Sequence, residues 1–462
     1  MVVTFATLPT PDTLDRVAKI LMDAGQVDSY AEAQLALNRY AVTVHVSEEC
    51  AQTPAGQAAL LTIAVTGSRA LPGGVFVDDA LDVPVQVGTY QGRRLRDLLV
   101  HAGAHVREAP HIELPVIRIG TFGAAPAAMK PTLQCFFEGW RGGVFPAGAA
   151  FVPQASGSAT TCAAVLAGAI AVSEIFQFHL GGNVQAGRRT VGLSLWRPGR
   201  VEAWWEDDAT EARVAFLPSS LWLIGLGHLG QAYLWVFALL PYLRPAELQL
   251  VLQDFDRLTQ ANTSTSVLTT PALVGELKTR AMAAWAEHQG FRTQILERKF
   301  AANFQVSEEE PTIALCGVDN AAARAALGDV GFRFIVNAGL GAGPVDFMAM
   351  RFYTFPGPKN PRAIWGTPRG KASAPIDRPA YRALRDAGID DCGLTLLAER
   401  TVGAPFVGVT AAAITIAEIL RALHGGGRTL IHDATLEALE HRQVLMGEPF
   451  QLGNPGFTEA RP

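Results

Sequence analysis

The sequence predicts an α/β protein with a parallel β-sheet covered by helices on both faces. Residues 206–426 alternate strand and helix patterns, as such a sheet requires. A glycine-rich turn, GLGHLG at 225–230, joins an apolar strand to a helix, which is typical of nucleotide-binding sheets. Two stretches 244 residues apart have similar sequences, which predicts two copies of one domain.

The length agrees with two domains. The chain has 462 residues, which suits two domains of roughly 200 to 250 residues each. We expect one domain at 1–205 and a second at 206–462. The charged and polar stretch 196–210 is the expected linker.

The first domain is expected to begin with a helical segment through Tyr40. Apolar strands are predicted at 41–46 and 60–65, and a long apolar helix at 167–182. That helix reads AGAIAVSEIFQFHLGG, and its counterpart at 411–426 reads AAAITIAEILRALHGG. Both end in Gly-Gly, a common helix C-terminus. Two alanine-rich helices can also agree through composition alone.

The first domain lacks the nucleotide motifs of the second. No G-x-G-x-x-G, D-x-D or Asp-Asn pair falls at the matching positions of 1–205. If the repeat is a duplication, the first copy has kept the residues that pack the domain and lost those that bind a nucleotide.

The second domain opens with a phosphate-binding pattern. Gly225, Gly227 and Gly230 have the G-x-G-x-x-G spacing, which lets backbone N–H groups and a helix N-terminus approach phosphate. A second strand ends in DFD, where Asp254 and Asp256 are placed to bind ribose hydroxyls. Alone, these residues indicate a nicotinamide-dependent oxidoreductase.

Polar residues further along favour a different chemistry. Asn262 follows the DFD motif, Lys278 lies on the helix after the second strand, and Asp319 and Asn320 follow a later strand. A lysine there can neutralise phosphate, and a carboxylate at a strand end can hold Mg²⁺. Hydride transfer needs neither. Taken singly, Lys278 can be a solvated charge and Asp319 the N-cap of the alanine-rich helix that follows.

In this order the motifs resemble those of the ThiF, MoeB and ubiquitin-activating-enzyme superfamily, over roughly residues 221–426. The resemblance implies an adenylating enzyme that uses ATP and Mg²⁺. It makes Asp254 the ribose ligand and Lys278 the phosphate cation. It makes Asp319 the Mg²⁺ ligand, with Asn262 on the phosphate side.

Three further positions bear on the resemblance. Arg324, five residues past Asp319, matches a family position. Thr265 departs from the family, which commonly has an arginine three residues after the Asn. A cation must then come from elsewhere, and Arg257 and Arg280 are nearby in the sequence.

The resemblance also implies an active site completed across a two-fold interface. Its ubiquitin-activating branch fuses an inactive and an active half, so we expect a monomer with an internal pseudo-dimer. In the family the partner half lends an arginine to the ATP phosphates. Arg39, in LALNRY at 35–40, is the candidate, and the alternative is a solvated arginine beside a buried Tyr40.

Cys392 is the candidate nucleophile. It lies in DDCG, just before 402–408, and the resemblance places a catalytic cysteine in a mobile crossover loop, here about 355–395. The alternative is a bystander thiol. The other four, Cys50, Cys135, Cys162 and Cys316, are expected to be inert.

Composition limits location and partners. The five cysteines contain no C-x-x-C pair, which fits a reducing, cytoplasmic setting and argues against a structural zinc site. A net charge of −5 disfavours nucleic acid as a partner. The uncharged run 216–243 is interrupted by its glycine turn and two prolines, so we expect buried structure and no membrane span.

These observations and the resemblance together predict an activating enzyme for a ubiquitin-like protein. It would adenylate the partner's C-terminal carboxylate, take the acyl group onto Cys392 and pass it to a conjugating enzyme, in a bacterial conjugation system of antiviral defence. The alternatives are adenylation of a sulfur carrier, peptide or small molecule, a nicotinamide-dependent oxidoreductase, and a non-catalytic nucleotide-binding scaffold. After Gly426 we expect one helix and an extended end.

Overall fold

The computed structural model describes residues 8–78, 82–107, 113–123, 129–149, 153, 158–367, 376–453 and 455–461. The first half contains α1 (Arg16–Ala24), α2 (Tyr30–Leu37), β1 (Ala41–Val46), α3 (Glu48–Ala51), α4 (Pro54–Ala70), β2 (Gly74–Val77), η1 (Gly88–Tyr90), α5 (Leu95–His101), β3 (His105–Val106), β4 (Val116–Ile119), β5 (Thr132–Glu138), β6 (Arg141–Pro146), α6 (Thr161–Leu180) and β7 (Val191–Ser194).

The second half contains β8 (Phe216–Pro218), β9 (Ser220–Ile224), α7 (His228–Leu239), η2 (Pro245–Glu247), β10 (Gln249–Gln253), η3 (Gln260–Ser264), η4 (Pro271–Leu273), α8 (Lys278–His288), β11 (Arg292–Leu296), β12 (Ile313–Cys316), α9 (Ala321–Ala326), η5 (Leu327–Asp329), β13 (Phe334–Leu340), β14 (Ala349–Phe355), α10 (Pro361–Trp365), α11 (Pro379–Asp386), α12 (Asp391–Ala398), α13 (Pro405–Leu423), β15 (Arg428–Thr435), η6 (Leu439–His441), β16 (Gln443–Gly447) and β17 (Phe457–Glu459).

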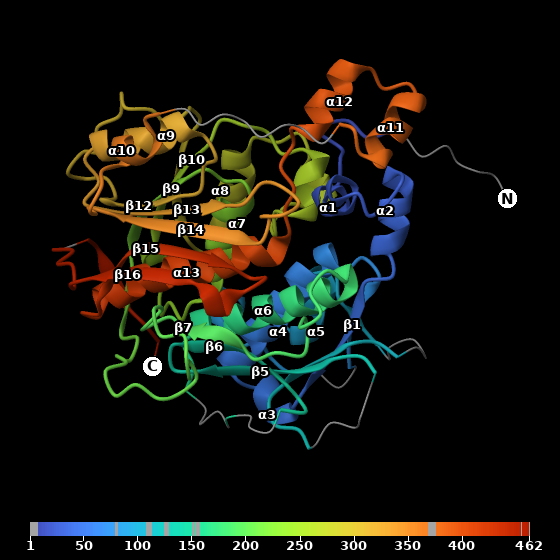
Figure 1. The fold of residues 1–462 in the computed structure, drawn as a ribbon. Coiled ribbons are helices and arrows are strands. Elements are labelled where there is room, and N and C mark those ends of the chain that lie inside the picture. The colour runs from blue at the N-terminus through green and yellow to red at the C-terminus, as the bar shows by residue number, and fades with distance from the viewer. Residues whose placement is uncertain are drawn as a thin grey trace.

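The two halves are built on sheets with the same strand order (Figure 1). The first sheet has the order β3-β2-β1-β4-β5-β6-β7, and the second has the order β11-β10-β9-β12-β13-β14-β15-β16. Each is parallel through β5 or β13 and antiparallel beyond. The shared order supports a duplicated domain. The predicted parallel sheet is corrected to a mixed one, because β14, β15 and β16 join its edge as antiparallel neighbours.

The two repeat helices, α6 and α13, pack against each other where the halves meet. By length and composition both qualify to cross a membrane, but 94% and 89% of their most apolar stretches are buried inside the protein. Small residues permit close packing, since a Cβ at Gly168 would lie 2.6 Å from the Ala59 carbonyl oxygen of α4. One hydrophobic core runs through both halves, so apolar burial holds them together.

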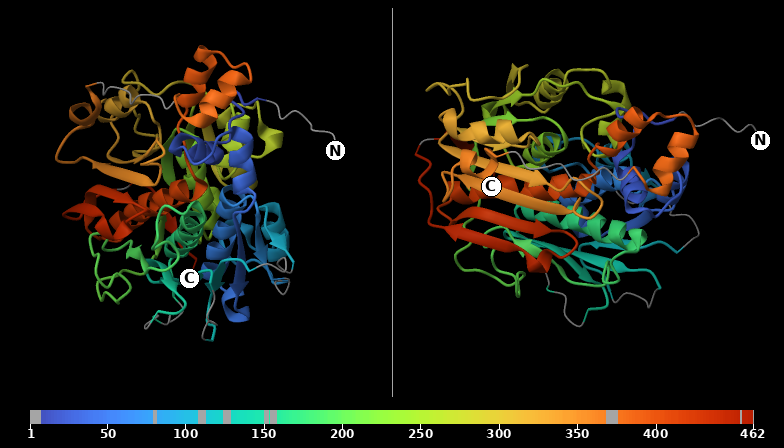
Figure 2. Two further views of the ribbon diagram at one scale, coloured as in Figure 1. Left: turned by 45° about the vertical axis from the view of Figure 1, so that its right-hand side comes forward. Right: turned by 45° about the horizontal axis from the view of Figure 1, so that its top comes forward.

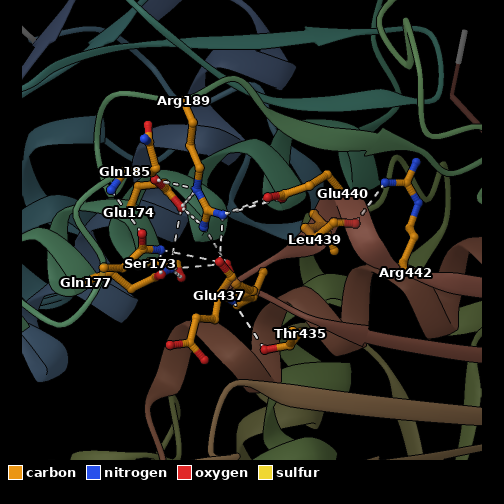
Figure 3. Close-up of polar contacts among 12 residues, drawn as sticks. Ser173, Glu174, Gln177, Gln185, Arg189, Thr435, Glu437, Leu439, Glu440 and Arg442 are labelled. Atoms are coloured by element: carbon orange, nitrogen blue, oxygen red, sulfur yellow. Dashed lines mark hydrogen bonds and ion pairs between the residues drawn. The ribbon is translucent and has the colours of Figure 1, made fainter.

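A buried ion pair links the halves beside α6 (Figure 3). The Glu174 side chain is 1% exposed, and its Oε1 lies 2.7 Å from Nη2 of Arg189. The same guanidinium donates to the carbonyl oxygens of Leu436 at 2.9 Å and Glu437 at 2.6 Å, both in the second half. Arg189 therefore joins a buried carboxylate of one half to the backbone of the other.

The second half carries a matching pair. Glu418 occupies the position of Glu174 in the second repeat. It pairs with Arg421, which donates to the Leu195 carbonyl oxygen of the first half. Because both pairs are buried and reach across the interface, they fix the relative orientation of the halves.

Two predicted elements differ in the structure. Residues 60–65 belong to α4 and not to a strand, because Thr53 caps a helix that begins with Pro54 and is buried on nearly every side. After Gly426, β15 and β16 extend the second sheet and β17 pairs with β8, whereas one helix was expected. The predicted strand at 41–46 is confirmed as β1.

Candidate functional site

A cavity of about 920 Å³ opens where β9, β10 and β12 end. Parallel strands bring their carboxyl ends to one edge, so residues distant in the sequence meet there. Eight of the predicted site residues line this cavity: Gly225, Gly227, Asp254, Asp256, Asn262, Lys278, Asp319 and Asn320. Gly230, Arg39 and Cys392 are not among the lining residues.

The three glycines of the turn have different structural roles. Gly225 adopts a φ of 88°, which a side chain disfavours. A Cβ at Gly227 would meet no atom within 4 Å, so a ligand can approach this backbone closely. A Cβ at Gly230 would clash with the carbonyl oxygen of Gly225. Gly230 therefore permits the close packing of α7 on the turn, while Gly227 faces open space.

Asp254 stabilises the glycine turn. Its carboxylate accepts hydrogen bonds from the backbone N–H groups of Leu226 at 2.7 Å, Phe255 at 2.8 Å and Asp256 at 2.9 Å. These bonds tie the end of β10 to the turn after β9. Asp256, with half of its side chain exposed, is the freer carboxylate for a ribose.

Lys278 lies close to both carboxylates. Its Nζ is 3.0 Å from Asp256 and 4.0 Å from Asp254, and its side chain is only 12% exposed. A solvated surface lysine is therefore ruled out by the geometry. The residue begins α8, whose N-terminus adds positive potential to that of the ammonium group.

Asp319 is an exposed carboxylate on the cavity wall. The N-cap of α9 is Asn320, whose side chain accepts from Ala323 N–H at 3.0 Å. Asp319 therefore does not cap the helix, and it has no hydrogen bond or ion pair with any described residue. No group of three metal-ligating side chains is found in the described ranges. A magnesium ion at Asp319 would take its other ligands from phosphate and water, as Mg²⁺ commonly does.

An arginine from the first half reaches the cavity, and it is Arg16, not the predicted Arg39. Arg39 is exposed beyond the end of α2. Arg16 begins α1, its backbone N–H donates to Ser264 Oγ at 3.2 Å, and its guanidinium donates to Thr401 Oγ1 at 2.6 Å. Burial lowers the pKa of Arg16, as does the neighbouring Arg400. Its backbone contact with Ser264 brings Arg16 to the loop in which Thr265 replaces the family arginine.

The crossover segment between β14 and α13 is largely helical where it is described, and residues 368–375 lie outside the described ranges. Its helices α11 and α12 lie beside α1 and α2 (Figure 2). Tyr381 Oη donates to Asp23 at 2.6 Å, and Lys19 Nζ, paired with Asp23, donates to the Ala398 carbonyl oxygen at 3.2 Å. The N-terminal helix thus anchors both crossover helices.

Cys392 is the second residue of α12 and is exposed. It is outside the cavity, whose wall the chain reaches at Thr401, Val402 and Gly403. The other cysteines are less accessible, and burial raises the pKa of each thiol, to about 11 for Cys50 and about 12 for Cys162. Thiols that stay protonated are poor nucleophiles.

Arg16 and His228 are among the residues of the cavity wall that the sequence motifs did not indicate. Arg16 directly follows the N-cap Asp15, so a capped helix start carrying an arginine was a usable signal. His228 stands inside the predicted turn, GLGHLG, as its one titratable side chain.

Two family models match this chain. The family described as BilD N-terminal domain matches residues 41–195, and the family described as BilD C-terminal domain matches residues 217–426. A protein of Collimonas sp. (strain OK412), described as bacterial E1-like protein BilD, is 42% identical over 461 residues, covering 97% of each chain.

Solved structures show more distant likenesses. The structure of E. coli MccB matches with a TM-score of 0.30 and 11% identity, covering 50% of this chain and 62% of MccB, less than two thirds of its length. E. coli tRNA N6-threonylcarbamoyladenosine dehydratase, TcdA, matches with a TM-score of 0.28 and 14% identity, covering 45% of this chain and 86% of that protein.

Proposed function

Because this chain belongs to the BilD family of bacterial E1-like proteins, we propose that it adenylates the C-terminal carboxylate of a ubiquitin-like protein. The observation that carries the proposal is the cavity wall, where the glycine turn, Lys278 and Asp319 of the second half meet Arg16 of the first. The cations Lys278 and Arg16 and the carboxylate of Asp319 suit a polyphosphate with Mg²⁺. Hydride transfer requires neither a phosphate cation at these positions nor a metal-binding carboxylate.

In this proposal ATP lies along the carboxyl ends of the strands. The backbone N–H after Gly227 faces its phosphates, with Lys278 as the nearby cation, whereas the N–H after Gly225 is held by Asp254. Asp256 binds the ribose, while Asp254 holds the turn. Asp319 makes no hydrogen bond or ion pair with a described residue, although its charge interacts with that of Arg16. Its oxygens therefore fit Mg²⁺, which would supply charge neutralisation on the phosphates.

The proposed reaction is a displacement at phosphorus. An oxygen of the substrate carboxylate attacks the α-phosphorus of ATP, the bond from that phosphorus to the bridging oxygen breaks, and pyrophosphate leaves. The product is an acyl-adenylate. Lys278 and Arg16 stabilise the charge that grows on the phosphate oxygens, which is where preorganised cations accelerate a reaction most.

A second proposed step uses Cys392. Its thiolate attacks the acyl carbon, a thioester forms, AMP leaves, and the thiol proton passes to solvent. The exposed thiol on α12 supports this choice, and the short connection to the cavity wall at Thr401 lets the crossover segment deliver it. A conjugating enzyme would then accept the acyl group, in a cytoplasmic conjugation system of bacterial defence.

Pyrophosphate exchange tests the proposal. With Mg²⁺-ATP and a partner protein encoded beside this chain, wild type should incorporate labelled pyrophosphate into ATP. Lys278→Ala and Asp319→Ala should each lower the rate on the order of 100-fold. Arg280→Ala is the matched control, because this exposed arginine pairs with Glu297. The variant should catalyse exchange at the wild-type rate.

Three outcomes oppose the assignment. Exchange at the wild-type rate by both Lys278→Ala and Asp319→Ala would show that the assigned site is wrong. Exchange with a small carboxylic acid in place of the partner would indicate a small-molecule substrate. Reduction of NAD without ATP use would place the chain among oxidoreductases.

A further inference from the structure

His228 is a titratable side chain of the cavity wall to which the proposed phosphate binding assigns no role. His228 is the first residue of α7 and lines the cavity within the glycine turn. Its ring lies between two glycines: a Cβ at Gly408 would clash with Nε2, and a Cβ at Gly403 would lie 3.7 Å from Nδ1. The imidazole therefore fills the space beside α13 and presents Nδ1 toward the crossover segment.

The two ring nitrogens have different surroundings. Nε2 is enclosed and makes no hydrogen bond of good geometry, while weaker hydrogen-bond interactions with the backbone of Pro405 and Ala404 favour the protonated ring. Burial lowers the pKa of His228 to about 4, and the Arg16 guanidinium acts in the same direction. The imidazole is therefore neutral near pH 7, with one nitrogen as donor and the other as acceptor.

We assign the proton of the neutral ring to Nε2, because the ring lies against the backbone of Pro405 and Ala404, whose carbonyl oxygens can only accept, and Nδ1 lies on the Gly403 side. Nδ1 is then a neutral acceptor on the Gly403 side of the cavity. It cannot pair with phosphate or carboxylate oxygens, which are acceptors as well. A ligand that satisfies Nδ1 must bring an N–H or O–H donor.

We propose that His228 Nδ1 accepts a hydrogen bond from the last peptide N–H of the substrate, so that it positions a polypeptide C-terminus between the glycine turn and Gly403. The inference rests on the proposed adenylation and narrows its substrate to a chain that ends in a peptide bond. A neutral acceptor orients the tail without neutralising the carboxylate, which keeps its nucleophilic charge. Arg16 and Lys278 serve the phosphates.

Two variants test the role of His228. His228→Ala should raise the KM for the partner protein about tenfold, the size of one hydrogen bond, while the KM for ATP stays within about twofold. His228→Asn retains an acceptor near Nδ1 and should recover most of the loss. Gly403→Ala adds a methyl group at ordinary contact distance from Nδ1, so it should fold and should also raise the partner KM.

A change in the substrate gives the sharper comparison. For wild type, the KM of a semisynthetic partner whose last peptide N–H is replaced by an ester oxygen should be about tenfold higher than that of the natural partner. For His228→Ala, the two KM values should be nearly equal. An equal ester penalty in both enzymes overturns the inference, as does a KM for ATP that rises as much as that for the partner. Wild type that exchanges no pyrophosphate with any partner refutes the proposed function itself.

Discussion

Replacing Arg189 by methionine tests whether the buried ion pairs hold the two halves together. The substitution keeps an unbranched apolar stem in place of the arginine methylenes and removes the charge that Glu174 faces at 2.7 Å. Burial raises the pKa of the Glu174 carboxyl, and the Arg189 guanidinium opposes that effect. Without Arg189 a carboxylate that is 1% exposed loses its cation, and two carbonyl oxygens of the second half each lose one of their two donors.

The expected loss of unfolding free energy follows from the burial of the Glu174 carboxylate, which Arg189→Met leaves without its cation. Removing one member of a buried ion pair typically costs about 3–5 kcal/mol, whereas replacing both members by apolar residues restores much of that stability. We therefore expect Arg189→Met to lose about 3 kcal/mol or more of unfolding free energy. The double variant Glu174→Leu with Arg189→Met should regain at least half. Arg244→Met, from an exposed pair with Glu247, should lose less than about 1 kcal/mol.

Urea denaturation, followed by the fluorescence of the eight tryptophans, measures these differences. Because one core spans both halves, wild type should unfold in a single transition, and Arg189→Met should lower its midpoint or split it in two. Arg189→Met within about 0.5 kcal/mol of wild type would refute the reasoning. So would a double variant less stable than the single one.

Further predictions concern the site and acid stability. Arg16→Ala should slow pyrophosphate exchange at least tenfold, whereas Arg39→Ala should leave it unchanged; the reverse order would restore Arg39 as the phosphate arginine. Cys392→Ala should keep exchange and lose the thiol-sensitive adduct seen on non-reducing gels, and an adduct that disappears only in Cys316→Ala would move the nucleophile. Burial lowers the pKa of His432 to about 3, so between pH 6.5 and 3 the unfolded chain binds a proton that the folded chain does not. The free energy of unfolding should therefore decrease as the pH is lowered through that window, by up to about 5 kcal/mol, and urea midpoints for His432→Phe should decrease less steeply.

Local patterns were enough to predict the parts of the site that follow strands. Gly225, Asp254 and Asp319 each stand just after an apolar strand, and parallel strands bring such positions to one edge. Lys278 was predicted for the same reason, since it begins the helix after β10. Spacing along the chain therefore predicted eight of the residues that line the cavity.

Local sequence patterns could not predict the residues that tertiary packing brings to the cavity. Arg16 contacts Ser264 from 248 positions away, so its role depends on how the N-terminal helix docks onto the second half. Arg39 was preferred because of a sequence resemblance around Tyr40, yet it lies outside the cavity. The run 60–65 was ambiguous for a similar reason, because an apolar stretch buried on every side has no helix or strand period to distinguish.

The central claim is that this chain transfers AMP from ATP to the carboxyl end of a protein. The most direct measurement is intact-mass spectrometry of the partner after brief incubation with Cys392→Ala enzyme and Mg²⁺-ATP, since that variant should stop at the adenylate. The account predicts a partner heavier by one AMP, with the added mass on its C-terminal peptide, and no such species with Asp319→Ala. A partner of unchanged mass, while the enzyme consumes ATP to ADP and phosphate, would contradict it.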